Sequence, residues 1–171
     1  ILEHLRADLG ERQARAMSVD VQSELEDALE VLSPLLSSRR IDVRQNSERA
    51  HVRARAGDLA QIFTNLTRNA LDAMPEGGVL EITSQRVNDE VVITFADNGP
   101  GVPAEIAPTI FDPFFTTRTS SKLGVGLGLY VSKEIAARWG GSIRLVEGVK
   151  QGATFVVKLP VDRGPNTREQ T

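Results

Sequence analysis

Apolar residues recur every three to four positions in several stretches of the chain, which is the spacing of amphipathic helices. We expect helices over Ile1–Arg15, Gln22–Ser37, Asp58–Ala73 and Gly126–Trp139, and a short one over Ala104–Ile110. Asp58 and Gln61 have the spacing of a capping box at the start of the third of these helices, and Pro75 ends it. Gly140-Gly141 is the corresponding stop signal after the last long helix.

Alternation of apolar and polar residues predicts strands between the helices. We expect them over Ile41–Gln45, His51–Ala54, Val79–Val87, Glu90–Ala96, Ser142–Val146 and Gly152–Leu159. Asn46-Ser47 is turn-like and should join the first two, while Asn88-Asp89 should close a hairpin between the next two. Helices mixed with antiparallel hairpins predict an α/β fold, an α+β two-layer sandwich whose mixed, mostly antiparallel sheet is covered on one face by helices.

The composition is that of a soluble globular domain, and it excludes several classes of protein. With 171 residues, 40% of them hydrophobic and 25% charged, the chain is long enough for a real core. A net charge of −3 gives no reason to expect nucleic acid or direct membrane contact. Without cysteine, and with only two histidines, disulfides and thiolate or zinc sites are not expected. A cytoplasmic location is the default.

Two groups of polar residues stand out beside the apolar patterns. Asn65 and Asn69 lie one turn apart, about 70–110° from the centre of the apolar stripe, where side chains reach either a ligand or solvent. Asp97 follows an apolar strand and precedes Asn98-Gly99-Pro100-Gly101. A carboxylate at that place can accept from an exocyclic amine such as that of adenine, and an ordinary Asp-Asn-Gly-Pro turn would have the same sequence.

The stretch Lys122–Leu129 carries glycines at every second position and runs directly into a helix. Such a backbone suits a phosphate, because the start of a helix has unpaired N–H groups. A glycine-rich hinge would show the same sequence pattern. Three phenylalanines in Phe111–Phe115 form either a satellite core cluster or the anchor of a lid. The polar, basic residues up to Leu123 suit a polyphosphate or a solvated, mobile loop.

Taken together and in order, five motifs resemble a known family. They are Asn65-Leu66-Thr67-Arg68-Asn69-Ala70-Leu71-Asp72-Ala73, Asp97-Asn98-Gly99-Pro100-Gly101, Phe111-Asp112-Pro113-Phe114-Phe115-Thr116-Thr117, Gly124-Val125-Gly126-Leu127-Gly128-Leu129 and Gly152-Ala153-Thr154-Phe155. They resemble the N, G1, F, G2 and G3 boxes of the catalytic, ATP-binding domain of bacterial sensor histidine kinases, within the superfamily of gyrase-type and chaperone ATPases. The third motif is similar to the nitrogen-regulation type. The resemblance covers roughly Val19 to Pro160.

The resemblance implies ATP and Mg²⁺ as cofactors and assigns a role to each box. Asn69 would coordinate Mg²⁺, Asn65 would lie beside the phosphates, and Asp97 would accept from the adenine amino group. Phe111–Leu123 would be a mobile ATP lid. The residues expected at the nucleotide are Asn65, Asn69, Asp72, Asp97, Gly99, Gly101, Val102, Phe111, Phe115, Thr116, Thr117, Arg118, Lys122, Gly124, Val125, Gly126, Leu127, Gly128, Leu129 and Thr154. Neither a P-loop nor a dinucleotide fingerprint fits these glycines.

Asn65 separates subclasses of this superfamily. In the hydrolytic branch a glutamate at this place activates water, and an amide cannot act as that base. The resemblance therefore implies transfer to a histidine of a dimerisation domain, and onward to the receiver domain of a response regulator. His4 and His51 do not stand in a phosphoacceptor motif.

By this resemblance, residues 1–16 would form the end of the dimerisation helix, residues 17–160 the catalytic domain and residues 161–171 a flexible tail. The sequence leaves open whether the parent protein is anchored in a membrane. The alternatives are an ATP-binding pseudokinase or interaction module, an anti-sigma-factor-type serine kinase and, last, a hydrolysing chaperone or topoisomerase fragment. Val125 and Ala153 depart from the usual residues of their boxes, and their effect on ATP affinity is left open.

Overall fold

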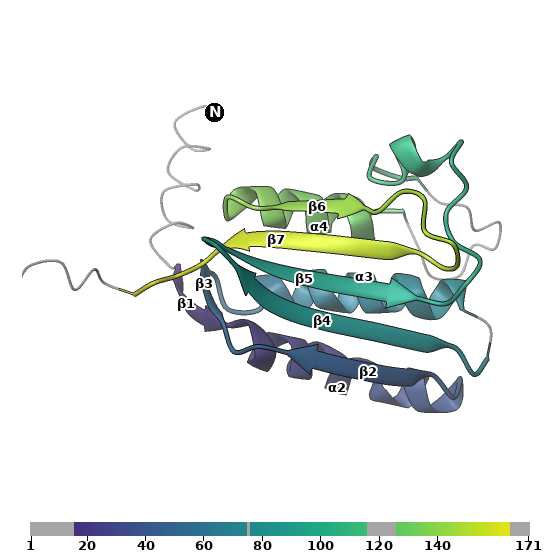
Figure 1. The fold of residues 1–171 in the computed structure, drawn as a ribbon, viewed down its shortest axis with the longest axis horizontal. Helices are drawn as coiled ribbons and strands as arrows, with labels where there is room; N and C mark the ends of the chain where they lie inside the picture. Colours follow the sequence, from purple (N-terminus) through teal and green to yellow (C-terminus); the bar gives the residue numbers. More distant parts are fainter. Residues whose placement is uncertain (1–15, 75, 116–125, 165–171) are drawn as a thin grey trace, which may run out of the picture.

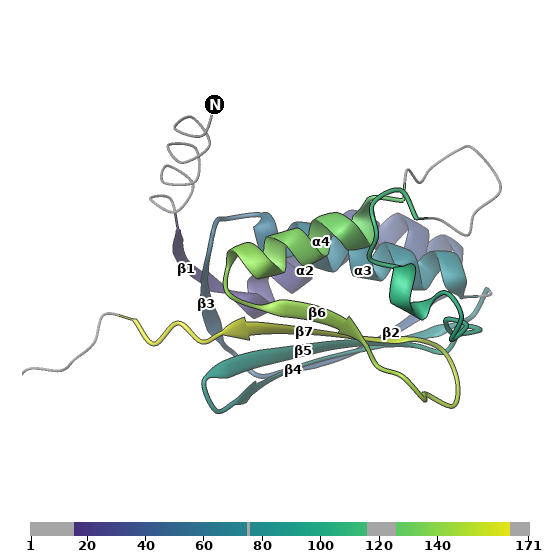
Figure 2. The same cartoon turned by 90° about the horizontal axis from the view of Figure 1, so that it is seen from above.

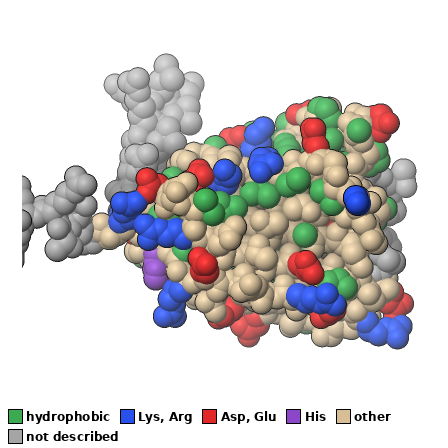
Figure 3. Space-filling model, viewed as in Figure 1, with side chains coloured by type: hydrophobic (Ala, Val, Ile, Leu, Met, Phe, Trp, Pro, Cys, Tyr) green, Lys and Arg blue, Asp and Glu red, His purple; other side chains and the backbone are tan. Residues whose placement is uncertain are grey.

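The computed structural model describes residues 16–74, 76–115 and 126–164. Three α-helices lie side by side on one face of a five-stranded sheet, so the described part of the chain forms two layers (Figures 1 and 2). The other face of the sheet is not covered by any described element (Figure 3). The predicted two-layer sandwich is thereby confirmed.

The helices are α2 (Val21–Ser38), α3 (Asp58–Ala73) and α4 (Gly128–Arg138), with a 3₁₀ turn η1 (Ala107–Thr109). Across the large sheet the strands run β2 (Asp42–Ser47), β4 (Val79–Val87), β5 (Glu90–Asp97), β7 (Thr154–Pro160) and β6 (Ser142–Leu145). Strand β2 is parallel to β4, and the other neighbours are antiparallel. The sheet is therefore mixed and mostly antiparallel, as predicted.

The core lies between the sheet and α3. On β5, Val91, Ile93 and Phe95 alternate with partly exposed residues and are buried against the helices. The apolar stripe of α3 meets them, and the ring centroids of Phe63 and Phe95 are 5.7 Å apart. Because strand side chains alternate between faces, this burial sends the odd-numbered residues of β5, including Asp97, toward the helix layer.

The segment from Ile41 to Ala54 differs from its prediction. Asn46 and Ser47 are not a turn but belong to β2, whose register pairs Ser47 with Ser84 of the parallel strand β4. Strand β3 (His51–Ala54) joins a different, two-stranded sheet, where it pairs antiparallel with β1 (Met17–Asp20), a strand that the sequence did not predict. Local alternation identified two strands but carried no information about their partners.

The first residues of the predicted tail make backbone contacts with β3. Val161 forms a β-bridge with Val52, and the backbone N–H of Asp162 donates to the His51 carbonyl oxygen at 2.7 Å. Val161 and Asp162 therefore lie beside β3. Ile1–Arg15 and the last seven residues, 165–171, lie outside the described residues.

The predicted capping box of α3 is wrong. The N-cap is Gly57, in a left-handed conformation, and no side chain of α3 caps this end. Glu24 of α2 does so instead, because its Oε2 accepts from the backbone N–H groups of Gly57 at 3.2 Å and Ala60 at 3.1 Å. The cap therefore comes from a neighbouring helix rather than from the local sequence.

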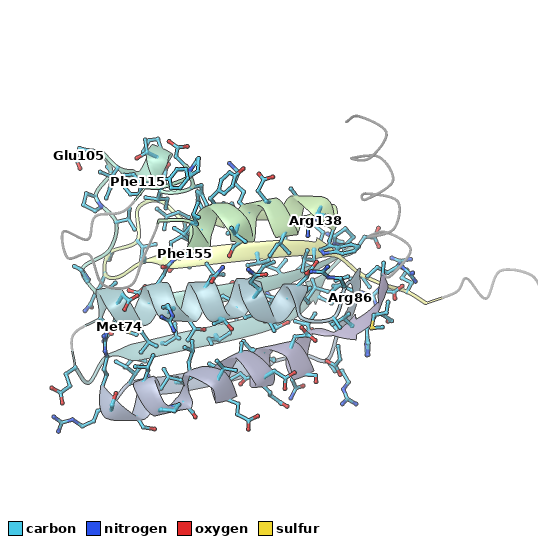
Figure 4. The ribbon with its side chains drawn as sticks, turned by 180° about the vertical axis from the view of Figure 1, so that it is seen from behind. Met74, Arg86, Glu105, Phe115, Arg138 and Phe155 are labelled. Carbon is cyan, nitrogen blue, oxygen red and sulfur yellow. The ribbon has the colours of Figure 1, made fainter. Side chains whose placement is uncertain are left out.

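Asp58 is buried and holds α4 instead of capping its own helix. Its carboxylate accepts from Trp139 Nε1 at 2.8 Å and lies 3.1 Å from Arg55 Nη2 and 3.6 Å from Arg138 Nη1. Trp139 and Arg138 end α4, so this one carboxylate ties the amino end of α3 to the carboxyl end of α4. Figure 4 shows Arg138 at that end.

Asp58→Ala should lower the free energy of unfolding by about 2 kcal/mol, since the indole N–H of Trp139 loses its acceptor and the arginines lose their partner. Urea unfolding followed by tryptophan fluorescence measures this change. Asp27→Ala, on the exposed face of α2, is the matched control and should stay within about 0.5 kcal/mol of the parent chain. Equal stabilities of the two variants would contradict the structural role of Asp58.

Candidate functional site

Asp97 ends β5 with a buried side chain whose two oxygens differ in their surroundings. Oδ1 accepts from the backbone N–H groups of Gly99 at 2.9 Å and Ala153 at 3.1 Å. Oδ2 accepts no hydrogen bond from another described residue, and it is not sealed from solvent. Burial raises the pKa of Asp97 above its ordinary 3.8, while the two N–H donors partly offset that rise. The carboxylate is held rigidly and keeps one acceptor oxygen unused.

Gly152 makes this arrangement possible. Its φ is +73°, and a Cβ at this position would overlap the carbonyl oxygen of Asp97. The close approach lets Ala153 exchange hydrogen bonds with Asp97, since the Asp97 N–H also donates to the Ala153 carbonyl oxygen at 3.0 Å. The fifth sequence motif is thus needed for the backbone geometry around the acidic residue of the second motif.

Asn65 and Asn69 are both half-buried on one edge of α3. Asn65 Nδ2 donates to the Gly128 carbonyl oxygen and to Ser132 Oγ, each at 3.1 Å, which joins α3 to the first turn of α4. The side chain of Asn69, one turn further along, makes no hydrogen bond with another described residue. An amide that is half-buried and unpartnered has its full bonding capacity left for a ligand.

Of the three described α-helices, only α4 begins without a capping side chain. Asp20 caps α2, where its carboxylate accepts from the Gln22 N–H at 3.0 Å, and Glu24 caps α3. The uncapped N–H groups and the positive end of the helix dipole make the start of α4 suited to an anion. Asn65 packs directly against it through Gly128.

The predicted glycine-rich motif is described from Gly126 onward. Gly126 has φ +70°, and a Cβ there would lie 2.5 Å from the Phe115 carbonyl oxygen, so only glycine fits against the phenylalanine segment. Leu127 is the N-cap of α4, Gly128 its first residue, and Leu129 packs against the core. The helix therefore begins two residues later than predicted. Gly124 and Val125 lie outside the described residues.

Two of the three clustered phenylalanines anchor this region to the core. Phe111 meets Phe155 edge-on, with centroids 6.2 Å apart, and Lys133 Nζ lies 5.7 Å from its ring centre. Phe115 also packs on the core, near the start of α4 (Figure 4), whereas Phe114 is 68% exposed. These contacts join two of the rings to the main core, and the anchor interpretation stays a prediction. Thr116, Thr117, Arg118 and Lys122 lie outside the described residues, so the predicted lid stays a prediction there.

The remaining predicted site residues fall into different places. Val102 packs against the core next to the Asp97 loop. Asp72 lies 3.9 Å from Arg39 Nη1, so this carboxylate faces a cation of the chain itself. Thr154 pairs with Ala96, and its side chain belongs to the sheet face opposite Asp97. That position does not favour a side-chain contact of Thr154 with a ligand beside Asp97.

The uncovered sheet face carries a shallow hollow of about 390 Å³, lined by Arg44, Val79, Glu81, Ala96, Asp97, Asn98, Val149, Gln151 and Thr154. Neither Asn65 nor Asn69 lines it. Figure 3 views this face, over which charged side chains are scattered without forming a continuous patch. The candidate site is therefore the helix side of Asp97 and not this hollow.

Within the described residues, no group of three or more His, Cys, Asp or Glu side chains could hold a metal ion. The candidate oxygen ligands on this edge of α3 are the amides of Asn65 and Asn69. A few hard oxygen ligands, supplemented by water and phosphate, fit Mg²⁺ and do not fit zinc or another thiolate- or imidazole-seeking metal.

Ser132 is a site residue that sequence reasoning missed. It is fully buried on α4, beside Ile135 and Ala136 on the inward face, and its hydroxyl meets Asn65. A serine on the apolar stripe of a helix was the available signal, since a buried hydroxyl needs a partner.

Comparison with known proteins assigns the family. The model of the histidine kinase-, DNA gyrase B- and HSP90-like ATPase family matches residues 54–163, and the chain belongs to this family. Within it, the chain is a catalytic domain of the sensor histidine kinase type. The nitrogen-regulation type stays a prediction.

Sensor histidine kinase ZraS of Escherichia coli (strain K12) is 33% identical over 147 residues, which are 85% of this chain and 31% of ZraS. The solved catalytic domain of histidine kinase ThkA superposes with a TM-score of 0.77 at 28% identity, covering 85% of this chain and 95% of that one. ThkA in complex with response regulator protein TrrA matches with a TM-score of 0.72 at 26% identity, covering 85% and 41%. The chain spans about a third or less of the curated relatives it matches.

Among the described residues, none of the helices is both long and apolar enough to pass through a membrane.

The raised pKa of Asp97 predicts how its charge affects stability. A carboxyl whose pKa is higher in the folded than in the unfolded state favours folding below the unfolded pKa, and this contribution is lost as pH rises through the folded pKa. Relative to the parent chain, Asp97→Asn should therefore become more stable as pH rises from about 3.5 to about 7. Urea unfolding at both pH values measures the difference. If the free energy of unfolding of the unsubstituted chain instead rose relative to that of the variant over this range, the prediction would be contradicted.

Proposed function

We propose that this domain binds Mg²⁺-ATP and transfers the γ-phosphate to a histidine on the dimerisation domain of its parent sensor kinase, for relay to a response regulator. The observation that carries the proposal is the Asp97 carboxylate, pinned through Oδ1 and open at Oδ2, on the same side of the sheet as the uncapped start of α4.

The open oxygen of Asp97 supports adenine as the base. An adenine amino group donates a hydrogen bond and satisfies a carboxylate oxygen, whereas guanine presents a carbonyl oxygen at the corresponding place. Because Oδ1 is already fixed by Gly99 and Ala153, the carboxylate cannot rotate to avoid that repulsion. The site should therefore discriminate between ATP and GTP.

The start of α4 and the edge of α3 support a place for the phosphates and the cation. The N–H groups at the amino end of α4 would bind phosphate oxygens, and Asn69, with its unused amide, would ligate Mg²⁺. When bound, the cation supplies neutralisation of phosphate charge. Lys122, Arg118, Thr116 and Thr117 are proposed as further phosphate contacts from the lid.

Asn65 supports transfer to a protein group over hydrolysis. Both N–H groups of its amide are engaged with Gly128 and Ser132, and the residue has no titratable group to activate water. A histidine imidazole is a competent nucleophile that needs little beyond in-line positioning. The dimerisation domain would provide it.

The ThkA–TrrA complex supports a receiver domain as the second partner, because a related kinase is solved with its response regulator. A pseudokinase is the main alternative from another class. The open oxygen of Asp97 and the unpartnered Asn69 favour nucleotide binding but do not distinguish binding from transfer.

The first test is calorimetric titration of ATP and GTP, with and without Mg²⁺, into the parent chain and Asp97→Asn. The parent chain should bind ATP in preference to GTP and more tightly with Mg²⁺. In the variant the amide N–H₂ would face the adenine amino group, so the Kd for ATP should rise about 10- to 100-fold, and the preference over GTP should shrink.

Asp27→Asn, on the outer face of α2, is the matched control and should bind ATP like the parent chain. Unchanged ATP affinity in Asp97→Asn would refute the adenine site. Transfer is then tested by adding the histidine-containing dimerisation domain of the parent protein with ATP labelled on the γ-phosphate. Tight Mg²⁺-ATP binding without labelling of that domain would favour the pseudokinase.

Asn69→Ala should abolish most of the Mg²⁺-dependent gain in ATP affinity while leaving metal-free binding nearly unchanged, because only the proposed cation ligand is lost. The same calorimetric titrations measure both quantities. Gln61→Ala removes another amide from an exposed position of α3 and is the matched control. A variant at position 69 that retains the full Mg²⁺ effect would remove Asn69 from the metal site.

A further inference from the structure

Ser132 and Asn65 form a buried polar contact between α4 and α3, near the start of α4. Ser132 has no exposed surface, and its Oγ lies 3.1 Å from Asn65 Nδ2. The same nitrogen lies 3.1 Å from the Gly128 carbonyl oxygen, one helical turn before Ser132. Two groups from α4 therefore hold one amide of α3.

The Gly128 contact identifies which atom of the Asn65 amide faces α4. A backbone carbonyl oxygen only accepts hydrogen bonds, so the atom that faces it must be the N–H₂ group and not Oδ1. An amide nitrogen has two hydrogens, and Gly128 and Ser132 use one each. Asn65 Oδ1 accepts no hydrogen bond from another described residue and is left as the open atom of the side chain.

We propose that Ser132 is a positioning residue, which holds the Asn65 amide so that its oxygen, and not its N–H₂ group, faces the nucleotide site. This inference rests on the proposed Mg²⁺-ATP binding. An amide oxygen repels phosphate oxygens but suits Mg²⁺ or a water of its hydration shell. Asn65 then serves the cation beside Asn69, while the N–H groups at the start of α4 serve the phosphates.

Such a role predicts an effect that loss of packing alone does not produce. Without the Ser132 hydroxyl, one of the two hydrogen bonds that hold the amide is lost, and the Gly128 contact alone leaves it more freedom about its last torsion. Groups that orient metal ligands typically change metal affinity about 10- to 100-fold when they are removed. The proposed adenine contact at Asp97 ends β5 and involves neither α3 nor α4, so ATP affinity measured without Mg²⁺ should not change.

The test compares Ser132→Ala with the parent chain in ATP titrations with and without Mg²⁺. We expect the Mg²⁺-dependent gain in ATP affinity to fall about tenfold, with metal-free ATP affinity unchanged, and Ser132→Thr to restore the gain. Ser84→Ala is the matched control, because Ser84 is also buried and its Oγ has no hydrogen-bond partner within the described structure. It should leave both affinities unchanged.

A second measurement needs no nucleotide. The two side-chain N–H₂ proton resonances of Asn65 should shift, and exchange faster with water, in Ser132→Ala but not in Ser84→Ala. Unchanged Asn65 resonances, or a loss of ATP affinity that is equal with and without Mg²⁺, would overturn the positioning role. If the unsubstituted chain binds no ATP at all, both the proposed function and the proposed role of Asn65 at the cation are refuted. Normal Mg²⁺ assistance in Ser132→Ala overturns the inference alone.

Discussion

The structure depends on one constraint, which is that helix α3 must face the core and the candidate site at once. Its apolar stripe packs Phe63 against Phe95 of the sheet, so the rotation of the helix about its axis is set by the core. That rotation leaves Asn65 and Asn69 half-buried at the edge of the stripe. Burial of the stripe fixes where the amides lie, and the site therefore inherits its rigidity from the hydrophobic core.

Both ends of the adjoining helix α4 are held by polar groups of α3. Asp58 holds the carboxyl end through Trp139 and Arg138, and Asn65 holds the first turn through Gly128. With its two ends fixed, α4 presents uncapped N–H groups at a defined place beside the asparagines. The same asparagine thus performs a structural task in the described state, which limits what its side chain can offer a ligand.

Much of the fold and of the candidate site follows from local sequence. Helical periodicity located α2, α3 and α4, and alternation with Asn88-Asp89 located the β4–β5 hairpin, because these features depend on neighbouring residues. The pairing of β2 with β4 and of β3 with β1 did not follow, since a strand's own pattern does not name its partner. The capping box failed for a related reason, as Glu24 caps α3 from 33 residues away.

By itself, the sequence determined the family, the order of the elements and the identity of the polar residues, since motif spacing and periodicity are properties of the chain. Tertiary structure decided how those residues are used. The close approach of Gly152 to Asp97 adds the Ala153 N–H to the local Gly99 contact at one carboxylate oxygen, while the other oxygen stays open. Only the packing of α4 on α3 turns the N–H₂ group of Asn65 toward Gly128 and Ser132. Hydrogen-bond direction depends on partners distant in sequence, and no local pattern encodes them.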